Sequence, residues 1–217
     1  MAHIKISAAP SIRRLPSYLH VVRQHRMMGG EFISGTLIAR ELNLEPIQVR
    51  KDLAITGITG KPKKGYPKEA LIAAIEGFLG WNSPEDAVLV GVGNLGTALM
   101  GYQAFRYHGL RIIAAFDKNP HKIGSTVHGI PVLDVLTMDT QIRRSGVKIA
   151  ILTVPSVSAQ EAANTLTAAG IEGIWNFTNV KLKVPDQVAV QKEDLSSGYA
   201  LLRVSMQTNR LIGEKWG

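Results

Sequence analysis

A glycine-rich loop, GVGNLG at residues 91–96, constrains the fold of this chain more than any other feature. The apolar run 87–90 before it fits a buried parallel strand, and residues 97–107 after it are expected to form a helix. A second apolar run, 112–116, ends in Asp117, which lies 21 residues past the last glycine of the loop. This order of strand, glycine loop, helix, strand and acid predicts a dinucleotide-binding βαβ unit.

The chemistry of this unit favours one class of cofactor. Glycines let the backbone approach a pyrophosphate, and an acid after the second strand can hold the hydroxyls of a ribose. Asp117 would repel a 2′-phosphate, which favours NAD(H) over NADP(H), while the adjacent Lys118 weakens that preference. A purely structural turn is the alternative. The cofactor-binding residues predicted here are Gly91, Val92, Gly93, Asn94, Leu95, Gly96, Asp117 and Lys118.

The rest of the C-terminal part repeats the alternation of strand and helix. A strand is expected over 147–154, a helix over 158–169, and another strand over 174–177. With the first unit, these elements predict an α/β fold with a doubly wound parallel sheet of the Rossmann type. The loops after the strands should lie beside the cofactor, although both are equally compatible with ordinary turns. This adds Thr153, Val154 and Pro155 to the predicted cofactor site.

Length and charge divide the chain into two domains. Its 217 residues suffice for a small head and an α/β body, with predicted domains at 1–82 and 83–217. Residues 1–80 hold 12 Lys and Arg against 6 Asp and Glu, whereas residues 81–217 hold 13 against 11. A basic head on a nearly balanced body predicts that the head alone meets a polyanion, with nucleic acid favoured over a membrane surface.

Three helices are predicted in the first part of the head. Apolar spacing and capping residues indicate helices over 11–28, 34–43 and 45–54. The last two, joined by a few residues, make a helix-turn-helix. The final helix would place Val49 and Leu53 inward, and the alternative is that 50–52 form only a solvated charged turn. Its predicted readers of a DNA major groove are Gln48, Arg50 and Lys51.

A basic, glycine-bounded segment follows at 57–66. Its three lysines and one tyrosine suit a hairpin wing laid along phosphates, so the head is expected to be a winged helix-turn-helix domain. The head is completed by a packing helix over 68–80, whose apolar face is expected to include Phe78, and by a linker over 81–86. The residues of the wing predicted to contact DNA are Lys61, Lys63, Lys64 and Tyr66.

Other chemistries are not indicated. The chain has no cysteine, no motif or histidine spacing indicates a metal site, and no proton donor of a hydride-transfer enzyme stands out. The dinucleotide is therefore interpreted as a signal, with no catalytic residue. An NAD-dependent oxidoreductase with an accessory N-terminal domain and a CoA- or nucleotide-binding module are the alternatives. Without an apolar leader or a membrane-length apolar run, a cytoplasmic protein is expected.

Six segments, taken in order, resemble the Rex family of NADH-responsive transcriptional repressors along nearly the whole chain. They are RRLPSYL at 13–19, VRKD at 49–52, GVGNLGTA at 91–98, FD at 116–117 with KIG at 122–124, AILTVP at 150–155 and WNFT at 175–178. The resemblance implies a homodimer that binds an inverted-repeat operator when NADH is low and leaves it when NADH rises. It also implies that the C-terminal helices, here from Asp194 to about residue 211, swap between protomers.

The resemblance further implies a switch that couples Arg14 of the head, Tyr102 after the glycine loop and Asp194 before the last helix. It also implies that Tyr102 contacts the cofactor. Each has an ordinary alternative, as a surface cation, a helix-face aromatic and a helix cap, respectively. The chain departs from the family pattern at 53–57, where LAITG replaces the common FSYFG, in its extra wing lysines, and at Gly198-Tyr199. These departures leave the operator sequence and the dimer geometry open.

Overall fold

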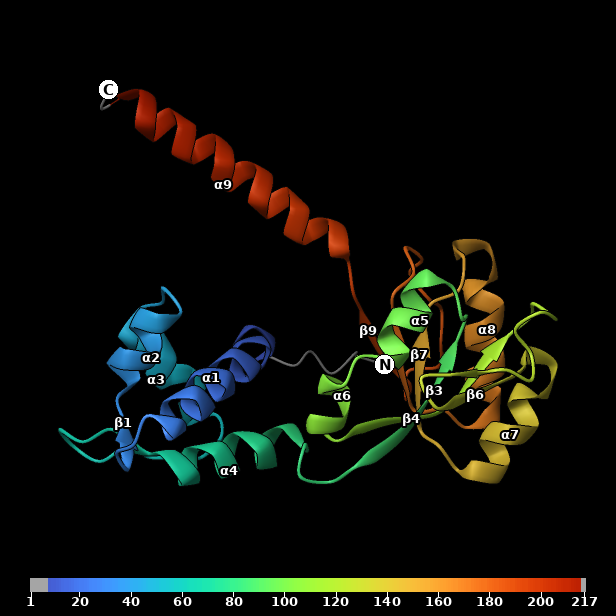
Figure 1. Ribbon diagram of the computed structural model, residues 1–217, viewed down its shortest axis with the longest axis horizontal. Helices are drawn as coiled ribbons and strands as arrows, with labels where there is room; N and C mark the ends of the chain where they lie inside the picture. The colour runs from blue at the N-terminus through green and yellow to red at the C-terminus, as the bar shows by residue number, and fades with distance from the viewer. Residues whose placement is uncertain (1–7, 216–217) are drawn as a thin grey trace. The chain divides into compact units, whose positions relative to one another are not determined.

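The computed structural model describes residues 8–215, and the surroundings of side chains through residue 209. The chain forms two compact units, Met1–Pro84 and Glu85–Gly217, which are called the head and the body below. Figure 1 shows the helices of the head and the sheet of the body. Within the described part of the chain, no helix combines the length and the apolar character needed to span a membrane.

The described part of the head is built from four helices and one small antiparallel sheet. Strands β1 and β2 pair Phe32 with Pro67 and Ile33 with Tyr66. Helices α2 and α3 are the predicted helix-turn-helix, and α4 is the predicted packing helix. The elements are α1 (Ala9–Met27), β1 (Phe32–Ile33), α2 (Gly35–Glu41), α3 (Pro46–Ala54), β2 (Tyr66–Pro67) and α4 (Lys68–Leu79).

Local sequence sets the ends of the helix-turn-helix. The Oγ of Ser34 accepts a hydrogen bond from the backbone N–H of Leu37 at 3.0 Å and so caps α2. Asn43, between the helices, has a φ of 52°, a left-handed conformation that asparagine tolerates. Pro46 takes the first position of α3, where no N–H is needed. The turn between the two helices is therefore encoded residue by residue.

All four helices contribute to one apolar core in the head. Lys68, at the start of α4, is buried, and its Nζ donates to the carbonyls of His25 and Gly29 at 2.6 and 2.5 Å, which ties α4 to the end of α1. Phe78 was expected on the packing face of α4, but it is 43% exposed, so that expectation is wrong. Fully buried members of the core include Leu15, Val22, Ile38, Val49, Leu53, Leu71 and Ile75.

The described part of the body is organised on a seven-stranded sheet. The order is β5-β6-β4-β3-β7-β8-β9, and every pair is parallel except β5 with β6. The chain winds outward from β3 in both directions, which confirms the predicted Rossmann-type sheet and places the reversal of strand order between β3 and β7. The strands are β3 (Glu85–Val90), β4 (Leu110–Asp117), β5 (Thr126–Val127), β6 (Ile130–Asp134), β7 (Ile149–Leu152), β8 (Gly173–Asn176) and β9 (Ala189–Lys192).

Helices cover both faces of this sheet. Alternate side chains of β3 separate two apolar clusters: Val88 and Val90 pack with α7 and α8, whereas Leu89 packs with α5 and α6. Parallel strands buried on both faces need such a double cover. The helices are α5 (Asn94–Met100), α6 (Ala104–Tyr107), the 3-10 turn η1 (Val135–Thr137), α7 (Met138–Ser145), α8 (Ser156–Ala169) and α9 (Leu195–Lys215).

The single helix expected over 97–107 is wrong. The structure divides this region into α5 and α6, which are separated by residues 101–103. A Cβ on Gly101 would lie 2.8 Å from the Nε2 atom of His128, so the imidazole packs against the bare backbone where α5 ends. The apolar spacing of residues 97–107 gives no information on this tertiary contact.

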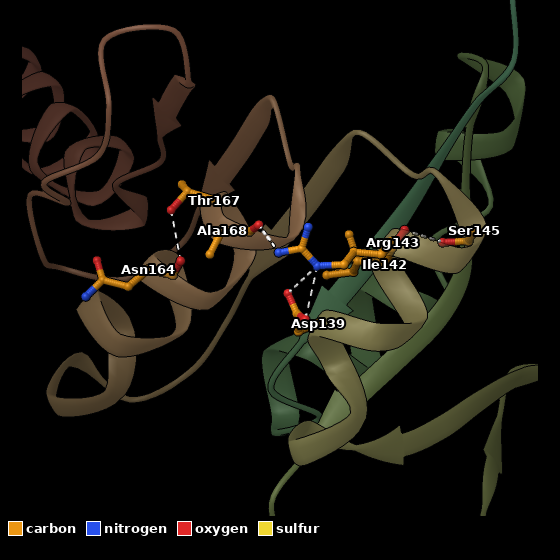
Figure 2. Close-up of polar contacts among 7 residues, drawn as sticks. All are labelled: Asp139, Ile142, Arg143, Ser145, Asn164, Thr167 and Ala168. Carbon is orange, nitrogen blue, oxygen red and sulfur yellow. Dashed lines mark hydrogen bonds and ion pairs between the residues drawn. The ribbon is translucent and has the colours of Figure 1, made fainter.

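A hydrogen bond from Arg143 joins α7 to α8 on one face of the sheet, and further bonds lie within each helix (Figure 2). The Nε of Arg143 donates to both carboxylate oxygens of Asp139 at 3.0 and 3.1 Å, and its Nη2 donates to the carbonyl of Ala168 in the last turn of α8. A cation is favourable at the C-terminal carbonyls of a helix. The hydroxyl of Thr167 also donates to the carbonyl of Asn164 at 2.9 Å. These bonds brace the face opposite α5 and α6.

Helix α9 differs from the other helices of the body because, over residues 195–209, where the surroundings of side chains are described, its apolar side chains are not covered. An exposed apolar row of this kind is normally buried against another surface. The dimer contact that the resemblance implies for this helix stays a prediction. Its exposed apolar residues, between 40% and 72% accessible, are Leu195, Tyr199, Leu201, Leu202, Val204 and Met206.

Candidate functional site

Helix α3 has one buried face and one exposed face. Val49 and Leu53 are fully buried, as predicted, while Arg50 and Lys51 are exposed. Asp52, which follows these cations, is completely buried as well. The alternative of a solvated charged turn at 50–52 is therefore wrong, because these residues are helical and one of them lies in the core of the head.

Asp52 is the centre of a polar cluster that joins α1 to α3. Arg14 donates from Nε to Oδ2 at 2.6 Å and from Nη2 to Oδ1 at 2.9 Å. Tyr18 donates its hydroxyl to Oδ2 at 2.5 Å, and Gln48 donates its amide Nε2 to Oδ1 at 2.7 Å. A buried carboxylate is tolerated when its oxygens are paired in this way. These four side chains, called the Asp52 cluster, hold α3 in register with α1.

Burial and hydrogen bonding act on this cluster in opposite directions. Burial alone would raise the pKa of Asp52, but hydrogen bonds, first from Arg14 and then from Tyr18, outweigh it and hold the pKa well below its usual value. The bond to Asp52 raises the pKa of Arg14. Burial, together with the bond to Asp52, raises the pKa of Tyr18 to about 12. Near neutral pH, a carboxylate therefore faces a guanidinium and a protonated phenol.

The Asp52 cluster changes the interpretation of two predicted residues. Gln48, expected to face a groove, is partly buried and its amide is held by Asp52. Arg14 is more than a surface cation, because its side chain is only 30% exposed and it pairs with a fully buried carboxylate inside the head. Arg50 and Lys51 remain the predicted α3 readers with exposed side chains.

A tight hairpin forms the predicted wing. The N–H of Lys61 donates to the carbonyl of Gly65 at 2.7 Å, and the N–H of Gly65 donates back at 3.0 Å. Lys63 lies at the tip with a φ of 60°. The Nζ atoms of Lys61 and Lys64 lie 5.2 and 5.6 Å from the ring centre of Phe32, within cation–π range. The hairpin therefore exposes three lysines on a short, hydrogen-bonded turn.

A basic hollow of 570 Å³ lies between the wing, the start of α2 and Arg50 in the middle of α3. Its lining includes Arg50, the three wing lysines and the segment 34–36. Tyr66 borders the hollow too, but it is only 8% exposed and packs in the head core. The ring lies against Gly60 of the wing, so little of it is exposed to DNA, and its predicted contact stays untested.

The glycines of the loop at 91–96 meet different steric demands. Gly91 has a φ of 99°, and a Cβ there would lie 2.9 Å from the carbonyl group of Thr153. A Cβ on Gly96 would lie 2.1 Å from the carbonyl oxygen of Gly91, whereas a Cβ on Gly93 would meet nothing within 4 Å. The first and third glycines are thus required by the fold, and the second leaves open space where a ligand can approach.

Asp117, at the end of β4, lies against this loop. Its Oδ2 accepts from the N–H of Val92 at 2.7 Å, and its Oδ1 accepts from the N–H of Asn119 at 2.8 Å. Lys122 donates its Nζ to the carbonyl of Val92 at 2.5 Å, while Lys118 is exposed. The acid and the glycine loop are therefore brought together as one unit, and Asn94 and Leu95, within the loop sequence, begin α5.

The segment 153–155 lies beside the glycine loop. The N–H of Thr153 donates to the carbonyl of Val90 at 2.9 Å, and its hydroxyl donates to the carbonyl of Gly91 at 2.7 Å. Val154 packs against the apolar cluster under α8, and Pro155 precedes that helix. The carboxyl ends of β3 and β7 are thus held edge to edge at the reversal of strand order.

A row of aromatic rings follows on the other face of the sheet. Three of them share an apolar cluster with Val92 of the glycine loop, and Tyr102, at the end of the row, is 56% exposed. Successive ring centres lie 5.0, 5.3 and 5.2 Å apart in the order Tyr102, Phe105, Trp175 and Phe177. An apolar cluster therefore extends from the glycine loop to the exposed ring of Tyr102.

Asp194 lies at the start of α9 and is exposed. Its Oδ1 accepts from the hydroxyl of Ser196 at 2.5 Å and from the backbone N–H of the same residue at 2.9 Å. These two bonds, with Lys192 nearby, lower the pKa of Asp194. The carboxylate therefore caps the helix as the ordinary alternative states, and it stays charged near neutral pH.

Several residues of these sites were missed in the sequence. Tyr18 lies four positions after Arg14, the spacing of neighbours on one helix face, which is a signal that could have linked them. Lys122 and Trp175 lie in segments that carried the family resemblance, but no role followed from their positions alone. The role of Asp52 required the tertiary contact between α1 and α3.

Comparisons with known proteins cover both units. The family model described as "CoA binding domain" matches residues 82–180, and the one described as "Putative DNA-binding protein N-terminus" matches residues 5–54. A protein of Treponema denticola named redox-sensing transcriptional repressor Rex is 60% identical over 210 residues, which cover 97% of this chain and 100% of that protein. A Bacteroides fragilis protein of the same name is 38% identical and covers 93% of this chain and 92% of its own length.

Solved structures of a protein called RSP are similar to this chain over nearly its whole length. The crystal structure of RSP in complex with beta-NAD+ and operator DNA is 31% identical to this chain, with a TM-score of 0.86 and coverage of 97% of both chains. The crystal structure of RSP in complex with beta-NADH is 29% identical, with a TM-score of 0.85 and coverage of 99% of both chains. RSP itself is described as a Rex-family repressor.

The raised pKa of Tyr18 predicts an alkaline loss of head stability. The folded head holds this phenolic proton more tightly than the unfolded chain, so the stabilisation is complete below pH 10 and is lost as the pH rises toward 12. We expect a loss of roughly 2–3 kcal/mol across this range, measured by urea unfolding. Tyr18→Phe should remove the part of this loss that belongs to Tyr18 and leave a smaller part from Tyr66, whose pKa burial also raises. Tyr107→Phe, at a ring that is 73% exposed, should retain the full loss. A Tyr18→Phe protein with the same alkaline loss would contradict this assignment.

Proposed function

The chain belongs to the Rex family of redox-sensing transcriptional repressors, and from that premise we propose that its body senses NAD(H) while its head holds operator DNA. It is a repressor that acts as a homodimer, with NADH and NAD⁺ as signals. Two basic heads related by two-fold symmetry match an inverted-repeat operator, and NADH binding releases it. The observation that carries this proposal is the presence of a basic winged helix and an open glycine loop in one chain.

On the DNA side, affinity and sequence readout come from different parts of the head. Lys61, Lys63 and Lys64 of the wing would bind phosphates, and so set affinity and its dependence on salt. Arg50 and Lys51 of α3 would reach base edges in the major groove, since both are exposed on the helix that follows the turn.

On the ligand side, the glycine loop would hold the pyrophosphate and Asp117 a ribose. Asp117 already accepts two backbone N–H bonds, so it is fixed in place before a ribose arrives. The nicotinamide would bind near Val92 and the aromatic row from Tyr102 to Phe177. NAD⁺ carries a positive charge on this ring and NADH does not, so an apolar surface favours NADH by the lower cost of desolvation.

We further propose that the protein does not catalyse a reaction of NADH and that it works in the cytoplasm. We also propose that Arg14, Tyr102 and Asp194 couple the NADH site to the DNA site. Arg14 holds two hydrogen bonds to Asp52, so a second carboxylate such as Asp194 would have to share or displace them. For NADH to empty the operator almost completely, it must favour the released state by about 5.5 kcal/mol.

A titration of a palindromic operator tests the proposal directly. Fluorescence anisotropy of a labelled palindrome, selected from a random palindromic library by the protein itself, should show tight binding without NADH and release as NADH is added. An equal concentration of NAD⁺ should release much less. Binding of no palindrome, or release that is equal for both nucleotides, would contradict the proposal.

Two glycines of the loop provide a matched pair of variants. Gly93→Ala should keep the fold, because its Cβ meets no atom of the chain, but should weaken NADH binding about tenfold or more by occupying the space of the ligand. Gly96→Ala should lower the free energy of unfolding by about 1–3 kcal/mol, because its Cβ overlaps the Gly91 carbonyl. Thermal unfolding and NADH fluorescence measure the two effects. Unchanged NADH affinity in Gly93→Ala would argue against this loop as the binding site.

Asp194→Asn tests the coupling without removing the helix cap. Asparagine caps helices as well as aspartate does, so α9 should keep its start, while the charge available to Arg14 is lost. NADH affinity should remain near the wild-type value, and the release of operator by NADH should become weaker. If both fall by the same factor, Asp194 acts in ligand binding and not in coupling.

A further inference from the structure

Helix α3 exposes an isoleucine on the same face as its two cations. Ile47, Arg50, Lys51 and Ala54 follow the spacing i, i+3, i+4, i+7, which places them on one side of a helix. All four are exposed, whereas Val49, on the opposite face, is fully buried. The face available to DNA is therefore partly apolar.

Ile47 is 57% exposed and does not belong to the apolar core of the head. It is the second residue of α3, after Pro46. The first turn of a recognition helix comes nearest to the base edges in the major groove. Ile47 is also stiff, because β-branching restricts its χ1 angle, so it can present its methyl groups at a small entropic cost.

The neighbouring polar side chain is withdrawn from this surface. Gln48 would otherwise be the amide reader of the first turn, but its Nε2 is bonded to Asp52 at 2.7 Å. The first turn consequently offers aliphatic carbon to the groove, and the next turn offers the cations of Arg50 and Lys51. In the major groove, the apolar feature of a base edge is the C5-methyl group of thymine.

We propose that Ile47 is a specificity-determining residue that contacts the C5-methyl group of one thymine in each operator half-site. This inference rests on the proposed DNA-binding function and names the base that its first helical turn selects. Arg50 and Lys51 supply the hydrogen bonds and charge, and Ile47 adds a preference for thymine at the position beside them.

Replacement of thymine by deoxyuridine tests this contact, because uracil keeps every hydrogen-bonding group and lacks only the methyl group. The probe is the palindrome selected by the wild-type protein, with each half-site thymine replaced in turn and symmetrically. At one position, we expect binding per half-site to weaken about fourfold, which corresponds to the roughly 0.8 kcal/mol of one buried methyl group. The other thymines should show little change.

Variants of the protein link that position to Ile47. Ile47→Ala should bind the thymine and deoxyuridine probes equally at this position, and Ile47→Val should retain part of the preference. Met28→Ala is the matched control, since Met28 is 76% exposed and lies outside α3, and it should keep the full fourfold difference.

Two results would overturn the inference: no thymine whose methyl group matters, or an undiminished preference in Ile47→Ala. In either case, the proposed function would stand if the wild-type protein still bound the unmodified palindrome and released it with NADH. Failure to bind any palindrome would instead reject the proposed function.

Discussion

The pairing of Arg14 with Asp52 is the interaction on which the DNA-binding part of this molecule depends. A carboxylate in a protein core is costly unless each oxygen is bonded, and here three side chains from α1 and α3 satisfy it. Removal of one partner from such a cluster typically costs about 3–5 kcal/mol, because the other charge is left unpaired. The two helices can therefore meet in only one register.

That register decides which residues of α3 can read DNA. Because Asp52 and Val49 face inward, the face of Arg50 and Lys51 must face outward, and Gln48 is drawn to the side. The wing is fixed to the same unit through the pairing of β1 with β2 and through the lysines that flank Phe32. In the body, close backbone contacts fix the glycine loop in a similar way, because Gly91 and Gly96 leave no room for a Cβ. Each site is thus built on a contact that tolerates little variation.

The sequence predicted these sites unevenly, for physical reasons. Where local rules decide, it succeeded: Ser34 caps α2, Pro46 begins α3, and the loop at 91–96 lies between a strand and a helix. Where tertiary contacts matter, it failed: the helix expected over 97–107 is broken after Met100, next to Gly101, whose backbone contacts His128. No helix or strand was predicted over 118–146, where β5, β6 and α7 lie, although the buried Met138 and Ile142 of α7 have helical spacing. The role of Asp52 depends on α1, nearly forty residues away in the chain, and no local pattern reports such a pair.

In the proposed function, NADH bound to the body and operator DNA bound to the head favour opposite states of one conformational equilibrium. Thermodynamic linkage then requires the coupling to be reciprocal. Calorimetric titration of NADH into the protein, alone and saturated with operator, measures it directly. The account predicts that operator lowers NADH affinity by the same factor by which saturating NADH lowers operator affinity. An NADH affinity that is unchanged by bound operator would contradict it.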